Sequence, residues 1–142
     1  MLLKKVNIIN IPSNEDNRGM LSAIEQLTDI PFNIRRIFYL HKIKKNRGGH
    51  ALKNTDELLI AVSGSFRIKL FDGTKTKTFL MNDPTKGLYI PRLVFLDMFD
   101  FTKNTVCLVL ANRKYNTNEY LRTPNDFLSY INKKGAKNKS CI

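Results

Sequence analysis

Short segments in which apolar and polar residues alternate, divided by turn residues, recur through the first 112 residues of the chain. An alternation with a period of two is typical of β-strands that bury one face. The dividing residues include Ser-Gly, Asp-Gly and Asn-Asp-Pro, which favour tight turns. The pattern predicts an all-β fold, a sandwich or barrel of antiparallel strands. We expect the strands within residues 4–12, 19–27, 33–43, 57–64, 65–73, 75–83, 86–100 and 105–112.

A helical pattern follows the last of these segments. Thr123 can cap the helix N-terminus and Pro124 suits its first position, before an apolar stripe of Phe127, Leu128 and Ile131. We expect this helix to pack across one end of the barrel. A chain of 142 residues has room for one core, so we expect a single domain over residues 1–131 and a basic, flexible tail over residues 132–142.

The formal net charge of +12 raises the question of nucleic-acid binding. Four of the lysines lie in the last ten residues, and the other basic residues form no stripe with interleaved aromatics. This distribution favours a small polyanion, such as a nucleotide diphosphate, over nucleic acid. Two cysteines make no disulfide framework, and we find neither a membrane-spanning run nor a signal peptide. We therefore expect a cytoplasmic protein with free thiols.

The stretch "NRGGHALKN", residues 46–54, contains one of only two histidines in the chain. The paired glycines allow backbone angles that other residues resist, and His50 then enters a strand. The alternation places Tyr39 and His41 together on one face of the preceding strand. In its own strand His50 shares a face with Leu52; if that face lines the barrel, His50 points into its mouth and can act in general acid–base chemistry. A structural histidine, hydrogen-bonded in a loop, remains the alternative.

Metal binding and nucleophilic catalysis find less support in the sequence. A metal site needs at least three converging ligands, but Leu52 stands where a cupin metal site has the second histidine of His-x-His. The later strand "PRLVFLDMF" adds no histidine. Cys107 lies in an apolar, core-like strand, and Ser63 and Ser65 flank a turn glycine. We expect no metal and no cofactor.

Six ordered motifs then carry a resemblance: "DNRGMLSAIE", "PFNIRRIFYL", "RGGHALKN", "ELLIAVSGSFRIKLFDG", "GLYIPRLVF" and "VCLVLANRKYNTNEYLRTPNDFL". Together they resemble the nucleotide-sugar 3,4-ketoisomerase family, which acts on dTDP-4-keto-6-deoxyglucose. The resemblance implies a cupin-like jelly roll, a homodimer that exchanges strands, no metal, and a dTDP-sugar bound in the barrel mouth. We expect the N-terminal strand "KVNIINI" to be the exchanged element, because it is apolar and precedes the first turn.

The implied reaction is a tautomerisation through an enediol, which moves the ketone from C4 to C3 of the sugar. His50 matches the first histidine of the family's His-Ala-His motif and is the candidate base, with Tyr39 and His41 as further catalytic candidates. Arg47 is expected to bind the diphosphate or the enediolate charge. The remaining substrate-binding candidates are Arg18, Lys53, Ser63, Ser65, Tyr89 and Arg92.

The chain departs from the family pattern at two places. Leu52 replaces the second histidine of the motif, and residues 92–95 read Arg-Leu-Val-Phe where members more often have Pro-Gly-Ile-Trp. Loss of one histidine removes a proton carrier or the group that orients one. A catalytically inactive dTDP-sugar-binding cupin is therefore the main alternative, and a C3/C5 epimerase is a further one.

Overall fold

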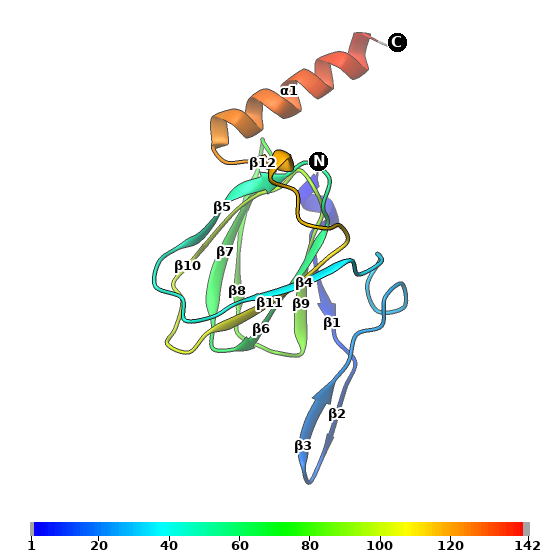
Figure 1. Ribbon diagram of the computed structural model, residues 1–142, viewed down its shortest axis with the longest axis vertical. Helices are drawn as coiled ribbons and strands as arrows, with labels where there is room; N and C mark the ends of the chain where they lie inside the picture. Colours follow the sequence, from blue (N-terminus) through cyan, green and yellow to red (C-terminus); the bar gives the residue numbers. More distant parts are fainter. Residues whose placement is uncertain (1, 141–142) are drawn as a thin grey trace.

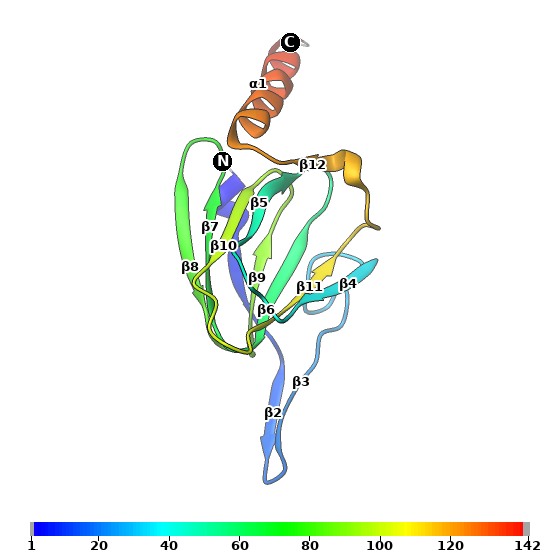
Figure 2. The ribbon, with the colours of Figure 1, turned by 60° about the vertical axis from the view of Figure 1, so that its left-hand side comes forward.

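Two five-stranded antiparallel sheets face each other in the computed structural model, which describes residues 2–140 (Figures 1 and 2). The first sheet has the order β1 (Asn7–Asn10), β9 (Lys86–Ile90), β6 (Glu57–Ser63), β11 (Val106–Ala111) and β4 (Arg36–Leu40). The second has the order β12 (Tyr120–Leu121), β5 (Arg47–Leu52), β10 (Phe95–Phe99), β7 (Phe66–Phe71) and β8 (Thr76–Met81). This arrangement confirms the predicted all-β, cupin-like jelly roll.

The segment expected as one strand over residues 86–100 forms two strands in different sheets. Strand β9 ends at Ile90 and β10 begins at Phe95. Pro91 lies between them, and because proline has no backbone N–H it interrupts the hydrogen-bonded ladder. The chain crosses from the first sheet to the second at this point.

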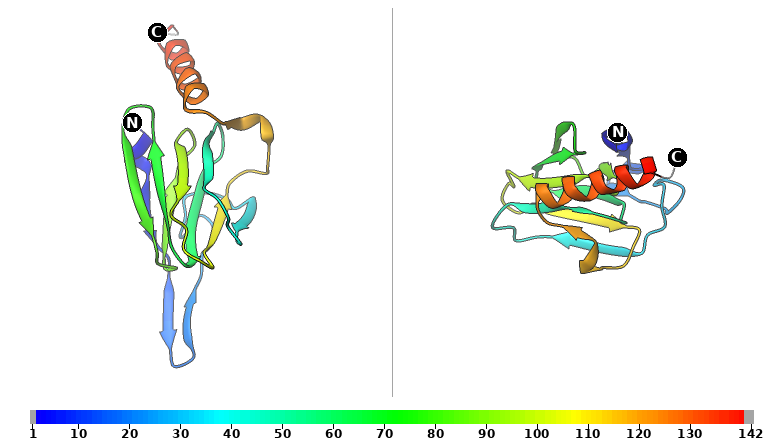
Figure 3. Two further views of the ribbon diagram at one scale, coloured as in Figure 1. Left: turned by 90° about the vertical axis from the view of Figure 1, so that its left-hand side faces the viewer. Right: turned by 90° about the horizontal axis from the view of Figure 1, so that it is seen from above.

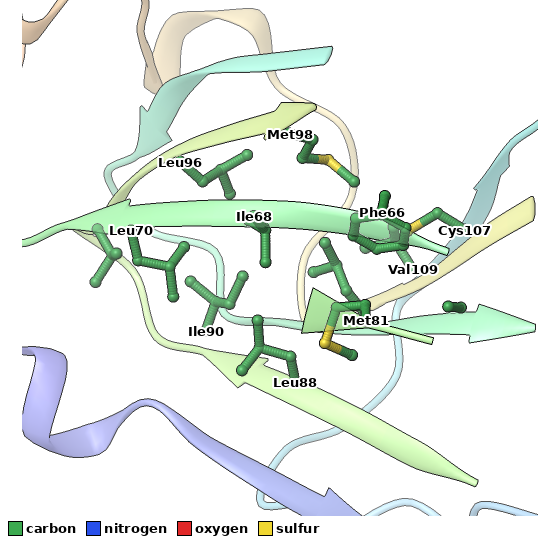
Figure 4. Close-up of a cluster of buried hydrophobic side chains, with 13 residues drawn as sticks. Phe66, Ile68, Leu70, Met81, Leu88, Ile90, Leu96, Met98, Cys107 and Val109 are labelled. Atoms are coloured by element: carbon green, nitrogen blue, oxygen red, sulfur yellow. The ribbon is translucent and has the colours of Figure 1, made fainter. Parts of the chain in front are cut away.

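The core lies between the sheets and follows the predicted alternation (Figure 4). In β7, Phe66, Ile68 and Leu70 are fully buried, whereas Arg67 and Lys69 are exposed. The other sheet contributes inward side chains from β6, β9 and β11 to the same cluster. A second cluster covers the outer face of the first sheet, where coil residues between β3 and β4 pack on β6 and β11.

A hairpin of β2 (Ser13–Asp16) and β3 (Gly19–Ser22) projects away from the barrel (Figures 1 and 2). Only these first residues of the segment expected as a strand over 19–27 pair in a sheet. Met20 and Leu21 of the hairpin are 56% and 64% exposed. Strand β1, which we expected to be exchanged between protomers, pairs with β9 within the one chain described; the exchange stays a prediction.

The helix α1 (Pro124–Ser140) lies over one end of the barrel, as expected (Figure 3). The Asp126 N–H donates to Thr123 Oγ1 over 3.0 Å, which confirms the predicted cap. Phe127 is fully buried, and its ring lies 5.9 Å from the rings of Phe71 and Phe95. The segment expected as a flexible tail from residue 132 is helical as far as Ser140.

Two short 3-10 helices complete the chain, η1 (Leu2–Lys5) and η2 (Thr117–Glu119). None of the helices among residues 2–140 combines the length and apolar character that a membrane crossing requires. Cys107 is free and buried, whereas Cys141 lies outside the described residues. The cytoplasmic location stays a prediction.

Candidate active site

An open pocket of about 600 Å³ lies between the two sheets. Its floor belongs to the core, since Leu59, Leu96, Met98 and Val109 are shared between the core cluster and the pocket. Its rim is polar and basic. The full lining is Arg36, Phe38, Leu40, Asn46, Arg47, Gly48, His50, Glu57, Leu59, Leu96, Met98, Val109, Tyr115, Tyr120 and Arg122.

A bulge in β5 sets the direction of His50. The register with β10 pairs Leu96 with His50 and Asp97 with Gly48, which leaves Gly49 as the extra residue. Both glycines have positive φ, +83° at Gly48 and +72° at Gly49, where a side chain would be strained. The extra residue shifts the alternation of β5, so Arg47, opposite Met98, and His50, opposite Leu96, both face the pocket.

The His50 imidazole is held in a basic, largely buried environment. Its ring meets the Tyr120 ring edge-on, with centroids 5.1 Å apart. Burial lowers the pKa of His50 from its usual value of 6.5, and the charges of Arg122 and Arg47 lower it further. The Gly48 backbone and Asp97 act in the opposite direction. The imidazole is therefore neutral at neutral pH and free to accept a proton.

Glu57 is a pocket residue that the sequence reasoning missed. It lies on the inner face of β6, in phase with Leu59 and Ala61, and is only 6% exposed. Burial raises the pKa of this carboxyl from 4.5 to about 7; Arg36 opposes the shift, and Glu119 and Asp56 add to it. The available signal was an acidic residue at an inward position of an otherwise apolar strand.

Three arginines give the pocket its positive charge. The Arg36 guanidinium carbon lies 4.6 Å from the centroid of the Phe38 ring, and Nε of Arg36 is buried without a hydrogen-bond partner among the described residues. Arg122 lies over the Tyr120 ring at 4.6 Å. Arg47 enters from β5. Guanidinium groups placed in this way suit a ligand with phosphate oxygens and aromatic rings.

The structure brings Arg47 and His50 together in the pocket, as expected, but not Tyr39 and His41. The alternation of β4 directs Phe38 and Leu40 inward, so Tyr39 is on the outer face and is 60% exposed. The Tyr39 and His41 rings do share that face, with centroids 5.3 Å apart. The expectation that Tyr39 lines the pocket of its own chain is therefore wrong, and His41 does not line this pocket either.

Arg18 and Lys53 also lie outside the pocket of their own chain. Arg18 is on the projecting hairpin, where its side chain is 86% exposed and paired with Asp16. Lys53 follows β5, and its Nζ lies 5.0 Å from the centroid of the Tyr130 ring of α1. Neither residue contributes to the pocket wall within one chain.

The last four expected substrate-binding residues have other neighbours. Ser63 and Ser65 lie at the turn between β6 and β7. Tyr89 is packed at the outer face of the first sheet. Arg92 is held by the Asp56 carboxylate, with an Nη2–Oδ2 distance of 3.2 Å. None of the four lines the pocket.

The chemistry available in the pocket is proton transfer. Burial raises the pKa of the Cys107 thiol to about 12, which makes this thiol a poor nucleophile. Across residues 2–140 we find no cluster of three histidine, cysteine or acidic side chains arranged to hold a metal ion. Leu52 is buried and does not line the pocket. The titratable side chains of the wall are the His50 imidazole, the Glu57 carboxyl, two tyrosines and the arginines.

The jelly roll and its open, basic pocket define a cupin-like protein. The fold matches that of the RmlC epimerase of Mycobacterium tuberculosis, with a TM-score of 0.71 over 87% of this chain and 72% of that chain. The two sequences are 14% identical, so this likeness concerns the fold alone.

Within this class, the chain belongs to the FdtA family, described as WxcM-like, C-terminal, whose model matches residues 4–132. It is 37% identical over 128 residues to a TDP-4-oxo-6-deoxy-alpha-D-glucose-3,4-oxoisomerase of Aneurinibacillus thermoaerophilus, covering 89% of this chain and 92% of the relative. It is also similar to a mutant of the 3,4-ketoisomerase QdtA of Thermoanaerobacterium thermosaccharolyticum, solved in complex with TDP-4-keto-6-deoxyglucose. That match has 38% identity and a TM-score of 0.86 over 90% of this chain and 94% of that chain.

Proposed function

We propose that the protein is a sugar 3,4-ketoisomerase that converts dTDP-4-keto-6-deoxyglucose to its 3-keto isomer. The observation that carries the proposal is the position of the His50 imidazole, which faces a basic pocket between the sheets, where burial lowers its pKa. Membership of the FdtA family and the reaction named for its relatives support the same activity. The product is suited to an aminotransferase that installs a 3-amino group.

The pocket can bind the two halves of such a substrate differently. Arg47, Arg122 and Arg36 offer charged donors to the diphosphate, for which paired guanidinium hydrogen bonds are well suited. Tyr115 and Tyr120 provide aromatic surface in the same wall. The apolar floor can accommodate the 6-deoxy sugar. His50 then acts as the base at C3.

We also propose a homodimer in which the β2–β3 hairpin of one protomer docks on its partner. The exposed Met20 and Leu21 side chains need apolar cover that their own barrel does not give. Docking of the hairpin would bring Arg18 to the partner's pocket, which is consistent with its expected role in substrate binding. Tyr39 and Ile37, each 60% exposed on the outer face of β4, offer a further apolar surface for the partner.

The test is proton NMR of dTDP-4-keto-6-deoxyglucose in deuterated buffer. We expect the C3 proton signal to disappear and a 3-keto product to form with the wild type, but not with His50→Asn. His41→Asn is the matched control, because it makes the same exchange outside the pocket. An unchanged spectrum despite dTDP binding would refute the isomerase and indicate a binding protein. Deuterium at both C3 and C5 would indicate an epimerase.

A further inference from the structure

The pocket contains a second proton-transfer group on the opposite sheet from His50. The migration of a ketone from C4 to C3 requires proton movement at both carbons and both oxygens, yet position 52 holds a leucine that does not face the pocket. Glu57 comes from β6 of the first sheet and His50 from β5 of the second. The two side chains therefore approach a bound sugar from different sides of the pocket.

The surroundings of Glu57 leave its carboxyl available to a ligand. Its inward orientation is fixed by the strand, which pairs Glu57 with Ile90 on one side and with Ala111 on the other. Glu57 is 6% exposed, and it forms part of the wall of the open pocket. A protonated carboxyl in this position can donate a hydrogen bond to a hydroxyl or keto oxygen of a substrate.

On the basis of the proposed function, we infer that Glu57 is a catalytic acid, which protonates the C4 oxygen while His50 removes the proton from C3. The C–H electron pair forms the C3=C4 double bond, and the π electrons of the C4 carbonyl take the Glu57 proton. This step leaves a neutral enediol, an imidazolium and a carboxylate. The carboxylate then takes the proton of the C3 hydroxyl, a C3 carbonyl forms, and the imidazolium returns a proton to C4. Both groups end in their starting states.

The protonation states at neutral pH suit these roles. The charged and titratable groups around Glu57 are Arg36 of β4, Glu119 of η2, Asp56 next to it and Cys107 of β11. Arg36 favours the carboxylate, but burial and the two acidic neighbours outweigh it and raise the pKa of Glu57 to about 7. Burial lowers the pKa of His50 below 6.5. Environments that separate two titratable groups in this way are typical of an acid and a base in one site.

The test combines Glu57→Gln with a pH profile. Glutamine keeps the size of the side chain but cannot give up and regain a proton in the cycle, so kcat should fall about 10²- to 10⁴-fold while the Kd for dTDP changes little. The wild-type kcat/KM should fall on the acid side below pH 6.5 as His50 gains a proton, and on the basic side near pH 7 as Glu57 loses one.

Glu119→Gln provides a second readout. Its amide oxygen can still accept the Thr55 hydroxyl hydrogen bond, but the negative charge that raises the pKa of Glu57 is gone. The basic limb should therefore move to lower pH, an effect that a purely structural role of Glu57 would not produce. This readout and the wild-type profile remain available if Glu57→Gln does not fold.

The outcomes separate the two proposals. An inactive wild type refutes the isomerase itself. An active wild type refutes the role of Glu57 if a folded Glu57→Gln keeps its kcat, if the wild-type profile stays flat above pH 7, or if Glu119→Gln leaves the basic limb in place.

Discussion

The buried Glu57 carboxyl should make the stability of the protein depend on pH in a way that Glu57→Gln removes. Its pKa rises from 4.5 to about 7 on folding, so between these values the folded state holds a proton that the unfolded chain has lost. The contribution of this bound proton to the free energy of unfolding is full below pH 4.5 and is lost as the pH rises towards 7. A shift of this size, at 1.36 kcal/mol per pKa unit, is worth at most about 3 kcal/mol.

A glutamine side chain is neutral at every pH in this range, so the free energy of unfolding of Glu57→Gln should lack this pH dependence. We therefore compare the free energies of unfolding of Glu57→Gln and the wild type at each pH. As the pH rises from 4.5 to about 8, the variant should gain up to about 3 kcal/mol of stability relative to the wild type. We would measure it by urea unfolding, followed by circular dichroism at one fixed protein concentration. Glu25→Gln, the same exchange at an exposed position, is the control. A difference that is constant with pH would refute this account of Glu57.

Three further predictions concern packing, assembly and backbone. Phe127→Ala should lower the free energy of unfolding by about 3–5 kcal/mol, measured by urea unfolding, because a fully buried ring between α1 and the second sheet is lost; a cost below about 1 kcal/mol would contradict this packing. Leu21→Asp should give a monomer in light scattering, and an intact dimer would rule out hairpin docking. Gly48→Ala places a Cβ 2.9 Å from the Leu96 carbonyl oxygen at a φ of +83°, so thermal and urea unfolding should show a loss of at least about 1–2 kcal/mol; unchanged stability would mean that the bulge tolerates a side chain.

Local patterns in the sequence were sufficient to predict most of the barrel. The alternation of β7 and the cap at Thr123 depend on neighbouring residues only, and both are as expected. The buried face of β4 could not be predicted, because both sides of the strand are mainly apolar or aromatic, Ile37 and Tyr39 on one and Phe38 and Leu40 on the other. Which side is buried depends on the packing of β4 at the edge of the sheet beside β11.

The site was only partly predictable for a related reason. His50 stood out because histidine is rare in this chain, and Arg47 is its near neighbour. Arg36, Glu57 and Arg122 come from separate strands and loops, and only the folded barrel brings them to the same pocket. The phase of Glu57 with Leu59 and Ala61 was the available signal, but an acidic residue at the first position of a strand is ordinary in a sequence, so its burial could be established only from the folded structure.

The projecting hairpin predicts the activity of heterodimers formed from two different inactive variants. If Arg18 acts in the pocket of the other protomer, His50→Asn and Arg18→Ala damage different residues of one shared site. A hybrid of the two then has one pocket with both defects and one with neither. Co-expression of two inactive alleles should thus restore part of the activity, whereas either allele alone restores none.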